Sequence, residues 1–198
     1  MLKKVKNFII LFFITLFFSS NCLSNDIKDF EIAGISLGQS LLEYVDENKI
    51  SSLKSESQYP NDKYIRYTVT KILSIKDYDV MNVLIKKNDP NYIIESISAG
   101  VAYNELEECL SLKKEIQNDI ESIFDANEKQ DTEFPSKQDP TGDSTVYGVQ
   151  YYTKPYPSNE GLSVNCYHMT KKIDIQRLLR VTVNSEEYAY FLVNEAYN

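Results

Sequence analysis

The 198-residue chain contains no tryptophan, one histidine and three cysteines. Side chains that commonly act as general bases, nucleophiles or soft metal ligands are therefore scarce. His168 and the widely separated cysteines lack the paired spacing of a metal site, so we expect no metal and no cofactor. These absences argue against a catalytic centre, but they assign no function.

A long membrane-spanning run is also missing. The apolar run at residues 8–18 is preceded by three lysines and followed by small and polar residues. It is shorter than the roughly 20 residues that cross a bilayer, and this arrangement is typical of a secretory signal peptide. We predict a signal peptide at 1–24, cleaved between Ser24 and Asn25, with no stable membrane span afterwards. A lipid-modified Cys22 is the alternative, but Asn21 and Ser19 do not match the usual lipoprotein pattern.

Positive charge is in short supply. The chain has 21 basic and 29 acidic residues, a net charge of −8. Loss of the three signal-peptide lysines changes this to about −11, without any compensating basic stripe. Nucleic-acid binding is therefore excluded, and residues 25–198 are expected to form a single domain in the periplasm or outside the cell.

Alternating apolar residues predict strands with one buried face. A short strand is expected at 29–34, followed by two groups of three, at 64–70, 78–87 and 92–103, and at 144–153, 162–170 and 174–183. Turn residues at 88–91 and 170–172 indicate antiparallel hairpins. Gly34 and Gly38 are interpreted as turn glycines, because no phosphate-loop motif surrounds them.

Three helices separate and follow these strands. A capping box of Ser40 and Glu43 predicts a helix at 40–48, and Asn184 or Ser185 is expected to cap a last helix ending at residue 197. The longest helix is expected at 104–127, capped by Asn104 and Glu107, with an apolar stripe of Leu106, Cys109, Leu110, Ile116, Ile120, Ile123 and Phe124. The predicted fold class is α+β: antiparallel sheet or sheets with this long central amphipathic helix packed on one face, and a possible duplicated unit of one helix and three strands.

Residues 128–143 are polar and contain two prolines and a glycine, so they are expected to form a mobile surface loop. Asp125, Asn127, Lys129 and Asp131, which overlap the start of this segment, have calcium-loop spacing, but the lysine and a missing glycine favour a fraying helix end. Tyr147, Tyr151, Tyr152 and Tyr156 suggest carbohydrate binding, although packing in a sheet is the favoured interpretation.

After removal of the signal peptide, Cys109 and Cys166 are the only cysteines. Exported proteins fold in an oxidising compartment, and both residues are expected to face the interface between the long helix and the sheet. We predict a disulfide between them. If Cys166 were free, it would share a strand face with His168, as a nucleophile and its base would require.

The sequences FEIAGISLGQSL at 30–41 and NEAY at 194–197, after a signal peptide, resemble small exported proteins of marine alphaproteobacteria that have no assigned function. The resemblance covers most of the mature chain and consists of turn and cap residues. It implies export, and it supplies no catalytic or ligand-binding residues.

Two classes of function follow. The first is a soluble periplasmic or secreted binding or interaction module, whose partner is an unknown protein or small molecule of the cell envelope. The alternative is a hydrolase that uses Cys166 and His168. The scarcity of reactive side chains favours the binding module.

Overall fold

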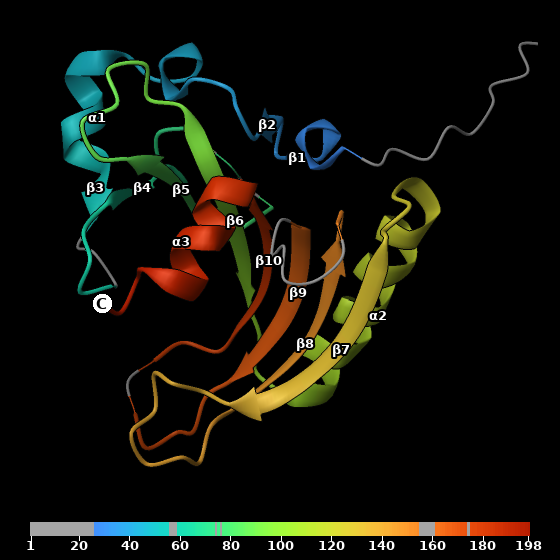
Figure 1. The fold of residues 1–198 in the computed structure, drawn as a ribbon. Coiled ribbons are helices and arrows are strands. Elements are labelled where there is room, and N and C mark those ends of the chain that lie inside the picture. The colour runs from blue at the N-terminus through green and yellow to red at the C-terminus, as the bar shows by residue number, and fades with distance from the viewer. Residues whose placement is uncertain (1–25, 56–58, 74, 76, 155–160, 174) are drawn as a thin grey trace, which may run out of the picture.

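A computed structural model describes residues 26–55, 59–73, 75, 77–154, 161–173 and 175–198. The predicted signal peptide and its cleavage site at Ser24 and Asn25 lie outside the described residues. The described chain forms an α+β fold built on one eight-stranded antiparallel sheet, with a separate two-stranded hairpin (Figure 1). Within this part of the chain, no helix is both long and apolar enough to cross a membrane.

Small elements come first in the chain. They are η1 (Ile27–Asp29), β1 (Glu31–Ile32), β2 (Ile35–Ser36), η2 (Leu41–Glu43), α1 (Glu47–Leu53) and β3 (Lys54–Ser55). Gly34 and Gly38 have φ of 77° and 81°, which confirms that they are turn glycines. The capping box of Ser40 and Glu43 is present, but it opens only a single 3₁₀ turn. The predicted start of the helix at residue 40 is therefore wrong, and α1 begins at Glu47.

The remaining strands form two antiparallel groups. The first contains β3, β4 (Tyr64–Thr68), β5 (Val80–Lys86) and β6 (Ile94–Ala102), and the second contains β7 (Glu128–Pro135), β8 (Thr145–Tyr152), β9 (Gly161–His168) and β10 (Leu178–Asn184). Their order in the sheet is β3-β4-β5-β6-β10-β9-β8-β7. β6 and β10 join the groups. The duplicated unit of a helix and three strands remains a prediction.

The prediction of a surface loop at 128–143 is wrong for the first half of that segment. Glu128–Pro135 is strand β7, which pairs along its whole length with β8. Its side chains are mostly exposed on both faces because β7 is an edge strand, so the alternation that marks a half-buried strand is missing. The calcium-like residues Lys129 and Asp131 belong to this strand and not to a fraying helix end.

The longest helix, α2 (Leu106–Ile123), is shorter than predicted at both ends. Glu105 is the N-cap residue without a side-chain cap, and the backbone N–H of Asn104 donates to Glu108 at 3.3 Å, so the cap predicted from Asn104 and Glu107 is wrong. Of the predicted apolar stripe, Cys109, Ile120 and Phe124 are buried, whereas Leu110 and Ile123 are exposed. α2 lies against β9 and β10, in one half of the sheet, so the prediction of a central helix is not confirmed.

Cys109 on α2 and Cys166 on β9 are held in disulfide geometry, with their Cα atoms 6.0 Å apart. Both side chains are almost completely buried in the main hydrophobic core. The structure thus pairs the two cysteines that the sequence predicted to pair.

The sheet has one apolar and one polar face. The pairing register places Val83, Ile97, Val183, Leu162 and Tyr151 in a row across β5, β6, β10, β9 and β8. This apolar face forms the main core with α2 and with the small elements that precede β3. The alternate residues of the same strands necessarily face the opposite side.

A second, smaller core fixes α3 (Glu186–Asn194) on the polar face of the sheet. Ser185 caps this helix, as predicted, by accepting a hydrogen bond from the Tyr188 N–H at 3.2 Å. Phe191 is completely buried, and its ring centroid lies 4.9 Å from that of Tyr64 on β4. In Figure 1, α3 lies in front of β6, while β7 and β8 curve away beside it.

Candidate ligand-binding site on the polar face of the sheet

A hollow of about 230 Å³ lies on the polar face between the strands and α3. We call it the polar hollow. Its lining residues come from seven strands, from α3 and from the segment before β4: Tyr59, Arg66, Asn82, Leu84, Ser96, Ser98, Phe134, Gln150, Ser163, Asn165, Tyr167, Arg180, Thr182, Asn184, Tyr188 and Leu192. None of these is an aspartate, glutamate, histidine or cysteine.

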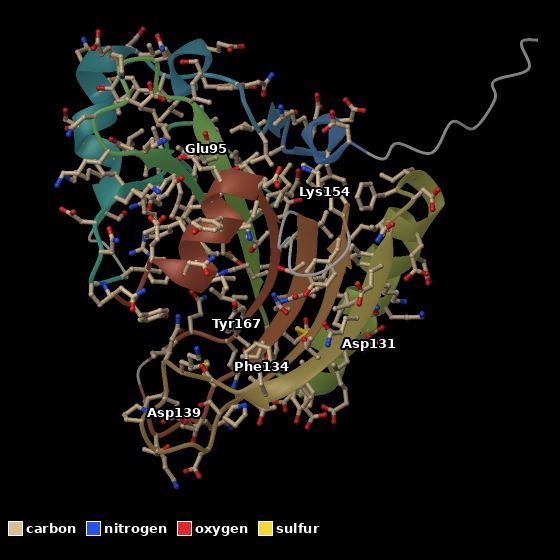
Figure 2. All side chains as sticks on the ribbon, viewed as in Figure 1. Glu95, Asp131, Phe134, Asp139, Lys154 and Tyr167 are labelled. Carbon is tan, nitrogen blue, oxygen red and sulfur yellow. A yellow bond between two sulfur atoms is a disulfide. The ribbon has the colours of Figure 1, made fainter. Side chains whose placement is uncertain are left out.

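Curvature of the sheet creates the hollow. Arg66 on β4 and Phe134 on β7 border the same space, although their strands are six positions apart in the sheet. In a flat sheet with neighbouring strands about 4.8 Å apart, they would be separated by about 29 Å. The strands therefore curl toward α3. Figure 2 shows Phe134 and Tyr167 close together on this side of the sheet.

Two rows of side chains form the floor. The pairing register aligns Asn82, Ser98, Thr182, Ser163 and Gln150 in the first row. These side chains are short or are amides, whereas a strand face exposed to bulk water usually carries lysine and glutamate as well. The first row thus offers a continuous series of neutral hydrogen-bonding groups.

In the second row, a glycine lies on each side of a pair of polar residues. This row runs Gly100, Arg180, Asn165, Gly148 and Thr132 across β6, β10, β9, β8 and β7. A Cβ atom on Gly148 would overlap the Asn165 Oδ1 atom and lie 2.5 Å from the Thr132 Oγ1 atom. Glycine at this position therefore makes room for the polar groups beside it.

Three polar atoms of this second row are buried without a hydrogen-bond partner in the described chain: Asn165 Oδ1, Thr132 Oγ1 and Arg180 Nε. Asn165 is only 7% exposed, and its Nδ2 group donates to Ser163 Oγ at 3.1 Å. Buried polar groups in folded proteins nearly always have partners, so this row has unused hydrogen-bonding capacity. A ligand can supply the missing partners.

Aromatic side chains complete the walls. The guanidinium carbon of Arg180 lies 5.1 Å from the ring centroid of Tyr167. Burial, followed by the interaction with Tyr59, raises the pKa of the Tyr188 phenol far above its usual value, so Tyr188 stays protonated and neutral. Beyond the hollow, Lys137 of the β7–β8 loop lies 5.6 Å from the ring centroid of Tyr197, so this loop reaches the end of the chain after α3.

The residues considered from sequence lie elsewhere. Tyr147 and Tyr151 are on the apolar side, where the Tyr151 hydroxyl donates to Glu121 at 2.9 Å, whereas Tyr152 is on the polar side. Tyr156 lies outside the described residues. The four tyrosines therefore do not form one carbohydrate platform, and the burial of Tyr151 and Tyr152 agrees with packing in a sheet.

His168 is the last residue of β9, and its Nδ1 atom is buried without a hydrogen-bond partner in the described chain. Burial lowers its pKa first, and the nearby Arg177 cation lowers it further. Cys166 is bonded to Cys109, so it has no thiolate for this imidazole to activate. Across the described residues, no group of three or more histidine, cysteine, aspartate and glutamate side chains is arranged to hold a metal ion.

Comparison of the chain with protein-family models, with curated proteins and with solved structures gave no match. The sequence did carry one signal for the polar hollow: the polar side chains that β5, β6, β8, β9 and β10 contribute to its lining are asparagine, serine, glutamine, threonine, tyrosine and arginine. Lys86 lies on the same face at the end of β5, but it is outside the lining and pairs with Glu187 of α3.

Proposed function

We propose that the chain is an exported binding module, located in the periplasm or secreted, that takes a small-molecule ligand into the polar hollow. The observation that carries this proposal is the row of buried polar atoms without partners beside Gly148. A structural sheet face gains nothing from leaving such atoms unpaired, since each costs about 1–3 kcal/mol. A ligand site needs them available for binding.

Binding is favoured over catalysis by the chemistry of the lining. The described lining contains serines, but a serine nucleophile needs an adjacent base, and no histidine, carboxylate, cysteine or lysine lines the hollow beside them. The hydrolase alternative depends on a free Cys166, whose sulfur is bonded to Cys109. We therefore do not carry that alternative forward.

A small molecule is favoured over a protein partner by the shape of the site. The polar hollow is concave and is bordered by the sheet on one side and α3 on the other. Its volume of about 230 Å³ is slightly below the roughly 300–1,000 Å³ of typical small-molecule pockets, so it suits a small ligand. Export is supported by the predicted signal peptide and by the disulfide, which persists in an oxidising compartment.

The binding proposal can be tested by nuclear magnetic resonance on ¹⁵N-labelled protein. A mixed set of sugars, organic anions and neutral aromatic compounds should shift the backbone amides of Ser98, Ser163 and Thr182. Ser163→Phe fills the floor and should remove these shifts, whereas Ser111→Phe on exposed α2 should preserve them. Responses confined to other surfaces, or unchanged by Ser163→Phe, would refute a site in the polar hollow.

Export has its own test. Intact mass spectrometry of the protein recovered from the cell envelope should give a chain that begins at Asn25. A lipid on Cys22, or retention of the first lysines, would show that the predicted processing is wrong.

A further inference from the structure

We infer that the ligand of the polar hollow is a small organic anion whose carboxylate or phosphate group binds the guanidinium group of Arg180; this inference rests on the binding function proposed above. The first observation is a local reversal of charge. The whole chain has a net charge of −8, yet the described lining places Arg180 among neutral side chains and contains no acidic residue. Exposed charges farther than about 8 Å away are largely screened at physiological salt, so the Arg180 cation sets the local charge at its end of the hollow.

The second observation is the state of Arg180. Its Nε atom is buried without a hydrogen-bond partner in the described chain, and one face of its guanidinium group is held near the Tyr167 ring. Partial burial of a cation costs free energy unless a counter-charge or hydrogen bonds compensate. The fork of N–H groups matches carboxylate and phosphate oxygens, which accept two parallel hydrogen bonds. An anion in the hollow supplies that compensation.

The surroundings of Arg180 accept an anion without repulsion. Asn165 and Thr132 lie in the same row and are neutral. The Tyr188 phenol also borders the hollow and stays neutral, because burial raises its pKa. The rings of Phe134 and Tyr167 add apolar surface next to the cation. These features together fit a ligand with one charged group and a flat or apolar body.

The test compares charged and neutral probes of nearly the same shape. Benzoate, phenyl phosphate and benzamide are titrated into the ¹⁵N-labelled full-length mature protein, and the dissociation constants are taken from the shifts of the Ser163, Asn165 and Thr182 amides. We expect the anions to bind roughly tenfold or more tightly than benzamide, as a charged hydrogen bond predicts. The ratio between benzoate and phenyl phosphate then shows whether the site prefers a carboxylate or a phosphate.

Two variants assign the effect to Arg180. Arg180→Gln should weaken anion binding about tenfold and leave benzamide unchanged. Lys114→Gln removes the same charge from the exposed surface of α2 and should leave all three constants unchanged. If Arg180→Gln does not fold, Arg180→Lys serves in its place; it keeps the charge, loses the fork, and should weaken benzoate binding several-fold.

The outcomes separate the two proposals. Equal binding of benzoate and benzamide at the hollow amides, insensitive to Arg180, would overturn the anion inference and leave the binding function standing. Shifts elsewhere, with none in the hollow for any probe and none for the wider compound set, would overturn both. Anion-selective shifts that Arg180→Gln abolishes would support both.

Discussion

The guanidinium group of Arg180 lies against the ring of Tyr167 on the neighbouring strand, with 5.1 Å between its central carbon and the ring centroid. The register pairs Arg180 with Asn165 and Tyr167 with Leu178, so the contact is diagonal across β9 and β10. A diagonal contact of this kind fixes the direction of a long side chain that would otherwise sample many rotamers. Arg180 is thus oriented before any ligand arrives.

Gly148 is predicted to be the residue that keeps the second row open. In Gly148→Ala the new methyl group would overlap the Asn165 amide and press on Thr132, so we expect a loss of about 1–3 kcal/mol of stability from overpacking. Urea unfolding measures this loss, and the shift of the Asn165 side-chain amide resonance reports its displacement.

Gly100→Ala is the matched control, since Gly100 lies in the same row on the other side of Arg180. Its methyl group would come 3.1 Å from a Val80 methyl carbon, which can move, so we expect a smaller loss than for Gly148→Ala. Equal losses for the two variants would mean that the space beside Asn165 has no special role.

The disulfide is predicted to carry a large part of the stability. Cys109 and Cys166 are 57 residues apart in sequence, and closing a loop of that length is worth about 4 kcal/mol in the entropic description. For a domain of this size that corresponds to a fall of roughly 8–16 °C in melting temperature when a reductant is added. A double variant, Cys109→Ala with Cys166→Ala, should melt at the lower temperature with or without reductant. An unchanged melting temperature of the reduced wild-type protein would contradict this prediction.

The attachment of α3 is predicted to depend on Phe191. This side chain is completely buried between Tyr59 and Tyr64, and Phe191→Ala should cost about 3–5 kcal/mol. Tyr190, the preceding residue, is 59% exposed, so Tyr190→Ala should change the free energy of unfolding by less than about 0.5 kcal/mol. Chemical denaturation of the two variants measures both values. A similar cost for both would mean that α3 is held by something other than the aromatic cluster.

The fold class followed from the sequence because most strands have one buried face. Period-two alternation identified β4, β5, β6, β8, β9 and β10, and turn residues identified the hairpins of β5 with β6 and of β9 with β10. β7 gave no such signal. Its residues Glu128–Pro135 are polar on both faces, and pairing with β8 alone makes them a strand. Local pattern cannot detect an element whose stability comes only from its neighbour.

The candidate site was missed for a related reason. The lining of the polar hollow is spread between residues 59 and 192, with one or two side chains from each strand. No local motif marks it, and Arg180 in isolation resembles any solvated arginine on a strand. The uncharged polar alternates of the strands are a weak signal, and the register, which brings Gly148, Asn165 and Arg180 into one row, is needed to locate the site. The disulfide was predictable because two cysteines allow one pairing.

The β7–β8 loop is predicted to depend on the charge of Asp139. Its carboxylate accepts hydrogen bonds from the Ser144 hydroxyl at 2.6 Å, from the Thr141 hydroxyl at 2.7 Å and from the Thr141 N–H at 2.8 Å. These bonds, that of Ser144 first, lower the pKa of Asp139 to about 2. The loop that the sequence predicted to be mobile is therefore organised around an ionised side chain.

The direction of the pH dependence follows from this lowered pKa. In the unfolded chain an aspartate has a pKa of about 3.9, so the unfolded state takes up a proton first as the pH falls. The stability that ionised Asp139 contributes is therefore fully present above about pH 4 and is lost as the pH falls toward 2. Urea unfolding of the wild-type protein and Asp139→Asn should show a stability difference at pH 7 that shrinks between pH 4 and pH 2.

Asp143→Asn is the control from the same loop, because Asp143 pairs with exposed Lys172 and its loss should cost under about 1 kcal/mol. A wild-type advantage that stays constant down to pH 2 would mean that the Asp139 hydrogen bonds do not depend on its charge.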